Sequence, residues 1–266
     1  MSGLATQKKH SHALNDEATI FVPPAVEAAC VSVQEGYERW AGIYDKTPNP
    51  LLALEECHLV NVLPNLVGSN VLDLGCGTGR WLARLLSLGA SSVVGIDLSP
   101  AMLGVARGSA GIRERLVLGD VLHLPFQAST FDFVLSSFAL NHIKNLQVIA
   151  QELARAMKLD GRLLISEMHP EACARGWRPG FRDIRGAVWV KTVSHSAESV
   201  ISIFRSNRFA FLRSHELYFA EPQRPIFLAS GRGGMFESAC EVPAIQVYEF
   251  RKIKPRSSFE AQQSEP

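Results

Sequence analysis

Three aspartates follow short apolar runs and are placed to recognise a nucleoside. Asp73 lies in Val-Leu-Asp-Leu, Asp97 follows Val-Val-Gly-Ile, and Asp120 follows Leu-Val-Leu-Gly. A carboxylate that ends the second strand of a nucleotide-binding sheet accepts hydrogen bonds from ribose hydroxyls. We expect Asp97 in that role and Asp120 beside an exocyclic adenine amine. One aspartate at a strand end is often only a helix cap, but three in succession favour a ligand site.

A glycine cluster follows Asp73. Residues 75–79 read GCGTG. Glycines between a strand and a helix let the backbone approach a ligand and point free N–H groups at an anionic or polar group. A tight turn is the alternative. The dinucleotide fingerprint requires a third glycine where this chain has Arg80, and Asp73 is a poor neighbour for a pyrophosphate. The loop therefore favours a ligand that carries a positive group.

Alternating strands and helices must position these residues. Short apolar runs separated by helical patterns are typical of an α/β fold with a doubly wound, mostly parallel sheet, which binds ligands at the carboxyl ends of its strands. The pattern predicts strands at 70–74, 92–97, 116–120, 131–137, 162–167, 209–219 and 244–253. It predicts helices at 23–40, 51–63, 80–88, 146–157 and 196–208, another starting at Ser99-Pro100, and an irregular stretch at 170–194.

Five segments in order resemble the class I S-adenosylmethionine-dependent methyltransferases, in the small-molecule (methyltransferase type 11-like) branch. The segments are VLDLGCGTG (71–79), VVGIDLSPAML (93–103), LVLGDVLHLPF (116–126), FDFVLSSFALNHI (131–143) and MKLDGRLLISEMHP (157–170). YERWAGIYDKTPNP (37–50) is similar to the lid segment that precedes the glycine loop in many relatives. The resemblance implies a Rossmann-like, seven-stranded sheet whose last strand is antiparallel, with an N-terminal helical lid.

The resemblance also implies S-adenosyl-L-methionine as the cofactor. Asp73 would hold the methionyl amine, directly or through water, and Asp97 the ribose. Asp120 and Val121 would meet the adenine edge, and Ser137 the methionyl end. The cofactor residues expected in this way are Tyr44, Asp73, Gly75, Cys76, Gly77, Thr78, Gly79, Asp97, Leu98, Met102, Asp120, Val121 and Ser137. No metal site is expected.

The expected domain organisation follows from the same patterns. A disordered arm covers 1–22 and a helical lid 23–64. The methyltransferase domain covers 65–254, with a substrate-side insert at about 169–195, and a frayed tail covers 255–266.

A base for methyl transfer, where one is needed, should come from the same edge of the sheet. His142 follows the fourth strand and His169 the fifth, and either histidine can take a proton near neutral pH. The alternatives are packing at a helix start for His142 and a turn before Pro170 for His169. Trp40 and Tyr44 on the lid would face a sulfonium or the acceptor through cation–π attraction, or simply pack against the core.

Composition limits the other classes of function. The formal net charge is +1, with 27 Lys and Arg against 26 Asp and Glu, which disfavours a nucleic-acid partner held by bulk charge. Five scattered cysteines and the lack of a long apolar run predict a cytoplasmic protein without a membrane partner. The leading hypothesis is methyl transfer to a small organic acceptor. The alternatives are a non-methylating or non-catalytic S-adenosylmethionine-binding protein, an RNA or protein methyltransferase, and an NAD(P)-dependent oxidoreductase.

Overall fold

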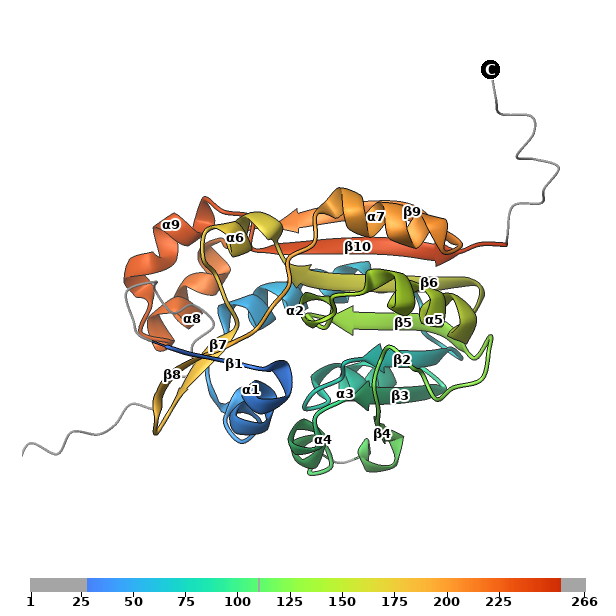
Figure 1. The fold of residues 1–266 in the computed structure, drawn as a ribbon, viewed down its shortest axis with the longest axis horizontal. Coiled ribbons are helices and arrows are strands. Elements are labelled where there is room, and N and C mark those ends of the chain that lie inside the picture. The colour runs from blue at the N-terminus through green and yellow to red at the C-terminus, as the bar shows by residue number, and fades with distance from the viewer. Residues whose placement is uncertain (1–27, 110, 255–266) are drawn as a thin grey trace, which may run out of the picture.

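The computed structural model describes residues 28–109 and 111–254. Its main sheet has seven strands in the order β4-β3-β2-β5-β6-β10-β9 (Figure 1). All neighbouring pairs are parallel except those made by β10, which runs antiparallel to both β6 and β9. The strands are β2 (Asn70–Leu74), β3 (Ser92–Asp97), β4 (Leu116–Leu118), β5 (Phe131–Ser137), β6 (Met157–Met168), β9 (Phe209–Leu217) and β10 (Ile245–Lys252). The expected seven-stranded sheet with an antiparallel last strand is therefore confirmed.

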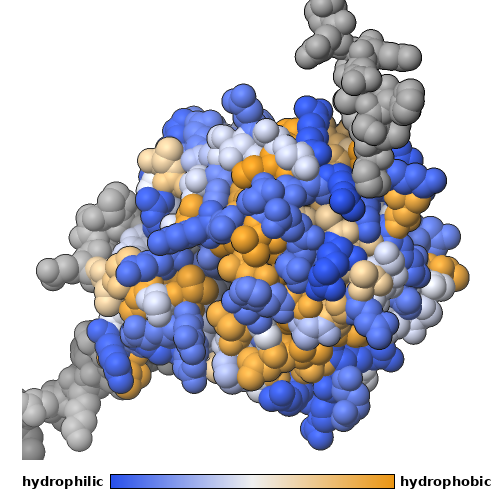
Figure 2. Space-filling model, turned by 45° about the vertical axis from the view of Figure 1, so that its right-hand side comes forward, coloured by the Kyte–Doolittle hydropathy of each residue, from blue (hydrophilic) through white to orange (hydrophobic). Residues whose placement is uncertain are grey.

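Helices cover both faces of this sheet because its strands alternate apolar side chains between two cores. Val71 of β2 belongs to the core under α2 (Pro50–Val62) and α3 (Arg80–Ser87). Its neighbour Leu72 belongs to the core under α5 (Leu146–Ala156) and α7 (Ala197–Ser206). On the face shown in Figure 2, hydrophilic side chains predominate and hydrophobic ones form a broken band across the middle. No helix in the described part of the chain is long and apolar enough to cross a membrane.

A second, smaller sheet lies beside the carboxyl ends of the parallel strands, together with α1 (Val33–Trp40) (Figure 1). It joins β1 (Ala29–Val31) in parallel to β8 (Gly186–Val190), and β8 pairs antiparallel with β7 (Gly180–Asp183). The predicted helix from residue 23 is therefore wrong at Ala29–Val31, where the chain is a strand, and the helix starts after Ser32. Ser32 caps it by accepting from the Glu35 N–H at 3.2 Å.

Other predicted boundaries also shift. The stretch 170–194 is not irregular, because it contains α6 (Pro170–Ala174), β7 and β8. The third predicted strand ends at Leu118, and β6 starts at Met157, earlier than the predicted 162. Between β9 and β10 the chain forms α8 (Arg224–Ala229) and α9 (Phe236–Cys240), which the sequence patterns did not predict. The predicted arm at 1–22 and the tail from 255 lie outside the described residues.

Candidate functional site

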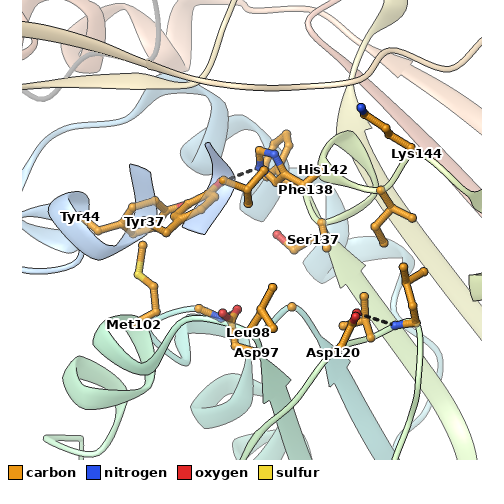
Figure 3. Close-up of a pocket in the computed structure, with 17 residues that line it drawn as sticks. Tyr37, Tyr44, Asp97, Leu98, Met102, Asp120, Ser137, Phe138, His142 and Lys144 are labelled. Carbon is orange, nitrogen blue, oxygen red and sulfur yellow. Dashed lines mark hydrogen bonds between the residues drawn. The ribbon is translucent and has the colours of Figure 1, made fainter. Parts of the chain in front are cut away.

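A cavity of about 300 Å³ opens at the carboxyl ends of β2, β3 and β5. Figure 3 shows Asp97, Leu98 and Asp120 on one side of it, Tyr37 and His142 on the other, and Ser137 between them. Its volume is at the lower end of the range for small-molecule sites. The residues that line it are Val33, Tyr37, Tyr44, Gly75, Gly77, Asp97, Leu98, Met102, Asp120, Val121, Leu122, Ser137, Phe138, Ala139, His142, Ile143 and Lys144.

Asp97 is held in place by backbone groups. Its Oδ2 accepts from the Gly77 N–H at 2.8 Å and its Oδ1 accepts from the Ser99 N–H at 2.8 Å. Each oxygen keeps a further lone pair for a ligand hydroxyl. Burial raises the pKa of Asp97, and the N–H donors of Ser99 and Gly77 act in the opposite direction. Ser99 in turn caps α4 (Pro100–Ala106) by accepting from the Met102 N–H at 3.2 Å, which sets Met102 at the cavity wall.

Asp120 is the more open of the two cavity carboxylates. Its Oδ1 accepts from the Leu122 N–H at 2.9 Å, and its side chain is 46% exposed. Among the residues that the structure describes, Oδ2 lies 3.8 Å from the exposed His123, which leaves it able to accept from a ligand amine. The two carboxylates therefore offer a rigid and an open acceptor on one wall.

The glycine loop has left-handed backbone at Gly75, Gly77 and Gly79, with φ of 71°, 53° and 82°. A side chain at Gly75 would come within 2.7 Å of Ala139 Cβ, whereas nothing lies within 4 Å of the position that a Gly77 Cβ would take. Gly77 therefore leaves open space on the cavity wall, and its positive φ favours glycine there.

Four of the five N–H groups of this loop are not free, which differs from the expectation that the glycine cluster points free N–H groups at a ligand. Gly75 and Cys76 donate to the Ile96 carbonyl, Gly77 donates to Asp97, and Gly79 donates to the Cys76 carbonyl. A pyrophosphate at a helix start needs such donors unpaired. The loop therefore suits a ligand without phosphate at this point.

Asp73 is buried without a partner for one of its oxygens. The side chain is 1% exposed, and its Oδ2 has no hydrogen-bond partner among the described residues. Burial raises the pKa of Asp73 to about 8, and the nearby Arg80 lowers it only in part. A buried, unsatisfied carboxyl beside the loop is complementary to a cation, such as an amino group.

The remaining predicted cofactor residues divide into two groups. Tyr44, Leu98, Met102, Val121 and Ser137 line the cavity together with Gly75 and Gly77. Asp73, Cys76, Thr78 and Gly79 do not. Cys76 lies in the buried core, and Thr78 donates to Asp45 at 2.9 Å.

His142 lies at the cavity in η3 (Leu140–His142), and its two ring nitrogens have different partners. Nδ1 is 3.2 Å from the Lys191 carbonyl oxygen, and Nε2 is 2.8 Å from the Tyr37 hydroxyl. Because a carbonyl only accepts, Nδ1 carries the hydrogen and Nε2 accepts from Tyr37. Burial lowers the pKa of His142 to about 4, so it does not titrate near neutral pH as the sequence reasoning assumed.

His169 does not line this cavity. Its Nδ1 accepts from the Glu171 N–H at 3.1 Å as the cap of α6, and its Nε2 lies 3.5 Å from Glu216. The alternative that His169 holds a turn before Pro170 agrees with this position. Trp40 likewise packs in the core, stacked on Phe181 at 5.1 Å.

Sequence reasoning missed two important residues. Tyr37 was placed only within the lid-like segment 37–50, without a role in the site, and Glu55 of α2 was not singled out at all. Glu55 is fully buried and accepts from Arg80, Trp81, Ser137 and Ser166. A pair of adjacent carboxylates, Glu55 and Glu56, within the apolar pattern of 51–63 was the available signal for it.

Comparisons with known proteins agree with this fold and site. Residues 72–165 match the family described as a methyltransferase domain. A demethylmenaquinone methyltransferase of Tropheryma whipplei is 36% identical over 147 residues, which cover 52% of this chain and 60% of the relative. A malonyl-[acyl-carrier protein] O-methyltransferase of Legionella pneumophila is 31% identical over 140 residues, which cover 52% of this chain and 47% of the relative. The chain therefore spans only about half of these relatives' length.

A solved structure shows the same fold. The S-adenosylmethionine-dependent methyltransferase from Mesorhizobium loti superposes with a TM-score of 0.61 at 23% identity, covering 77% of this chain and all of that one. The segment 72–165 thus resembles a methyltransferase domain, and the chain shares the Rossmann-like fold of class I methyltransferases.

Proposed function

We propose that the protein is an S-adenosylmethionine-dependent methyltransferase that acts on a small organic acceptor. The observation that carries the proposal is the arrangement of Asp97 and Asp120 on one cavity wall beside the unpartnered carboxyl of Asp73. These groups match the ribose hydroxyls, the adenine amine and the amino group of that cofactor. The acceptors named for one relative, a demethylmenaquinone methyltransferase, support a small organic acceptor.

Each cavity residue has a defined role in this proposal. Asp97 accepts from the ribose, Asp120 accepts from the adenine amine, and Leu98 and Met102 flank the adenine. The backbone at Gly75 and Gly77 leaves room for the methionyl chain, with Val121, Tyr44 and Ser137 completing the wall. Asp73 receives the amino group behind the loop and ionises when that cation binds, because burial raises its pKa to about 8 in the free protein. Cys76, Thr78 and Gly79 act by shaping the loop and make no contact with the cavity in this structure.

The bound cofactor supplies a methyl group on a positively charged sulfur. The chain's own part is to orient that group toward the acceptor and to exclude water, an effect worth about 7–11 kcal/mol in favourable systems. The aromatic wall made by Tyr37, Tyr44 and Phe138 supports this orientation and attracts a cation. His142 lies on the side of the same cavity opposite Asp97 (Figure 3).

The alternative functions have less support. The occupied N–H groups of the glycine loop and the Arg80 side chain disfavour a dinucleotide. The net charge of +1 disfavours an RNA acceptor. All five cysteines are free thiols, which supports a place in the reducing cytoplasm. A non-catalytic cofactor-binding protein is distinguished only by turnover.

A thermal melt with four ligands tests the proposal. S-adenosylmethionine and S-adenosylhomocysteine should each stabilise the protein by about 2.7 kcal/mol at a hundredfold excess over the dissociation constant. NADH and NADPH should not. Stabilisation by a nicotinamide alone would overturn the proposal, and release of S-adenosylhomocysteine with an acceptor panel would separate an enzyme from a binding protein.

A further inference from the structure

Tyr37 and His142 form a hydrogen-bonded pair whose donor and acceptor are both defined. They are 105 residues apart in the chain, and Tyr37 Oη lies 2.8 Å from His142 Nε2. The rings meet edge to face at 86°, with centroids 5.2 Å apart. The Lys191 carbonyl holds the hydrogen on Nδ1, so the Nε2 lone pair points at the tyrosine hydroxyl. The pair is thus set to move a proton from Tyr37 to His142.

Both members of the pair also line the cavity, on the side opposite Asp97 (Figure 3). The Tyr37 oxygen uses its hydrogen on His142 and keeps lone pairs that can accept from another molecule. A second, smaller space of about 30 Å³ adjoins the cavity and shares Tyr37, Tyr44, Phe138 and His142 with it. A molecule that extends from the cavity into this second space therefore passes Tyr37 and His142.

We propose that Tyr37 takes the proton from a hydroxyl acceptor and passes its own proton to His142, which makes the site an O-methyltransferase site. This inference rests on the proposed function and adds the acceptor class. The acceptor oxygen forms a bond to the methyl carbon, and the carbon–sulfur bond breaks with its electron pair left on sulfur. The acceptor's O–H proton goes to Tyr37 Oη, and the Tyr37 proton goes to His142 Nε2. One positive charge disappears at sulfur and one appears on the imidazole.

A weakly basic histidine is sufficient for this step. Burial lowers the pKa of His142 to about 4 and raises that of Tyr37 well above its usual 10, so both are neutral at rest. A hydroxyl becomes strongly acidic only as its oxygen gains the methyl group, and a weak base can then accept the proton. The neutral resting pair also avoids a second positive charge beside a cationic cofactor.

Other titratable groups face the pair and must be considered in any pH experiment. Tyr44 comes from η1 (Tyr44–Lys46), Asp97 from the end of β3, and Lys144 from the segment after η3. Burial raises the pKa of Tyr44 to about 12, so it stays neutral. The charge of Asp97 raises the pKa of Tyr37, and Lys144 lines the same cavity. Neither residue is hydrogen-bonded to the His142 ring, whose partners are Tyr37 and the Lys191 carbonyl.

The tautomer of His142 is the first test and needs no acceptor. The full chain with ¹⁵N-labelled histidine contains eight histidines, and His142→Asn identifies the signal by its loss. We expect the Nδ1–H tautomer, neutral down to about pH 5. An Nε2–H tautomer, or titration near the ordinary pKa of histidine, would overturn the inference.

The second test asks whether His142 senses the transferred charge. The His142 pKa is measured with saturating S-adenosylmethionine and then with S-adenosylhomocysteine, which lacks the sulfonium charge. We expect the pKa to be higher in the second complex by about one pH unit or more. Equal values would place His142 too far from the methyl group and defeat the inference. Failure of both ligands to bind would instead defeat the proposed function, and the tautomer result would stand independently.

A conservative variant tests the hydrogen bond itself. Tyr37→Phe removes only the hydroxyl, and we expect the His142 Nε2 signal to move toward that of a nitrogen without a donor. Tyr218→Phe, at an exposed tyrosine on another surface, is the matched control and should leave the signal in place. An unchanged His142 signal in Tyr37→Phe would overturn the pairing. If that variant does not fold, the wild-type measurements above decide the question.

Discussion

The guanidinium of Arg80 donates to the carboxylate of Glu55, and so joins the first residue of α3 to the middle of α2. Arg80 stands where a dinucleotide fold would have its third glycine. Here the Arg80 side chain links α2 to the start of α3, directly after the glycine loop. The same carboxylate accepts from Ser137, a cavity residue, at 2.7 Å. Glu55 therefore links α2, which precedes the main sheet in the chain, to Ser137 in the cavity wall.

Removing the Glu55 carboxylate should destabilise the protein strongly. Glu55→Ala leaves Arg80 without its buried partner, and the loss of one member of a buried pair costs about 3–5 kcal/mol. Glu171→Ala is the matched control, because Glu171 pairs with Arg175 at the surface and is 45% exposed. Surface pairs contribute about 0–1 kcal/mol. Denaturant unfolding of both variants measures the difference, and equal losses would contradict a central role for Glu55.

Ionisation of Asp73 should lower the stability of the free protein and raise its affinity for the cofactor. Its pKa of about 8 in the folded protein lies above the unfolded value, so this group's contribution to stability is complete at low pH and is lost as the pH rises toward 8. Asp73→Asn removes the ionisation, so the unfolding free energy of the variant should fall less between pH 5 and 8. The variant should bind S-adenosylmethionine more weakly. Calorimetry and melts across that range measure both, and tighter binding by the variant would exclude Asp73 as the amine partner.

Asp97→Ala should abolish detectable cofactor binding and leave the protein folded. The change removes the acceptor proposed for two ribose hydroxyls, and hydrogen bonds to a charged group contribute about 1.5–3 kcal/mol each. Asp132→Ala is the control, because that carboxylate bonds Lys158 and the Asn70 N–H and does not line the cavity. Calorimetric titration with S-adenosylhomocysteine compares the two. Unchanged affinity in Asp97→Ala would show that the ribose assignment is wrong.

The two histidines should differ in their effect on turnover. His142→Asn should lower kcat with a hydroxyl acceptor by about 10²-fold or more, the usual contribution of a positioned base. His169→Asn should lower it little, because His169 caps α6 outside the cavity. Release of S-adenosylhomocysteine is the measurement. A larger loss in His169→Asn would restore that residue as the base and remove His142.

Tyr37→Phe should discriminate between acceptor types. A thiol acceptor ionises near pH 8 without help, since its pKa is about 8.5, and should keep most of its rate in the variant. A hydroxyl acceptor should lose about 10²-fold or more. Paired alcohol and thiol acceptors of the same skeleton, assayed side by side at one pH, give the comparison. Equal losses for the pair would indicate that Tyr37 shapes the cavity without moving a proton.

Local patterns in the sequence determined the main sheet and one wall of the site. The runs at 70–74, 92–97 and 131–137 are apolar over a strand's length, and the structure has strands with those bounds. Because parallel strands place their carboxyl ends at one edge, Asp97 and Asp120 had to lie near each other. The residue type alone indicated an unusual backbone at Gly75 and Gly77, since only glycine readily adopts their positive φ.

Tertiary structure alone decided the acceptor side and the links to the N-terminal region. The periodicity around Ala29–Val31 favoured a helix, but pairing with β8 makes it a strand, and that partner lies more than 150 residues away in the chain. Three further contacts join segments far apart in sequence. They are the hydrogen bond from the Gly75 N–H to the Ile96 carbonyl, the four donors around Glu55, and the contact of Tyr37 with His142. Sequence spacing reports neighbours within one helix or strand. Burial and hydrogen-bond partners are set by how separate elements pack, and they decide which of several histidines or carboxylates becomes part of a site.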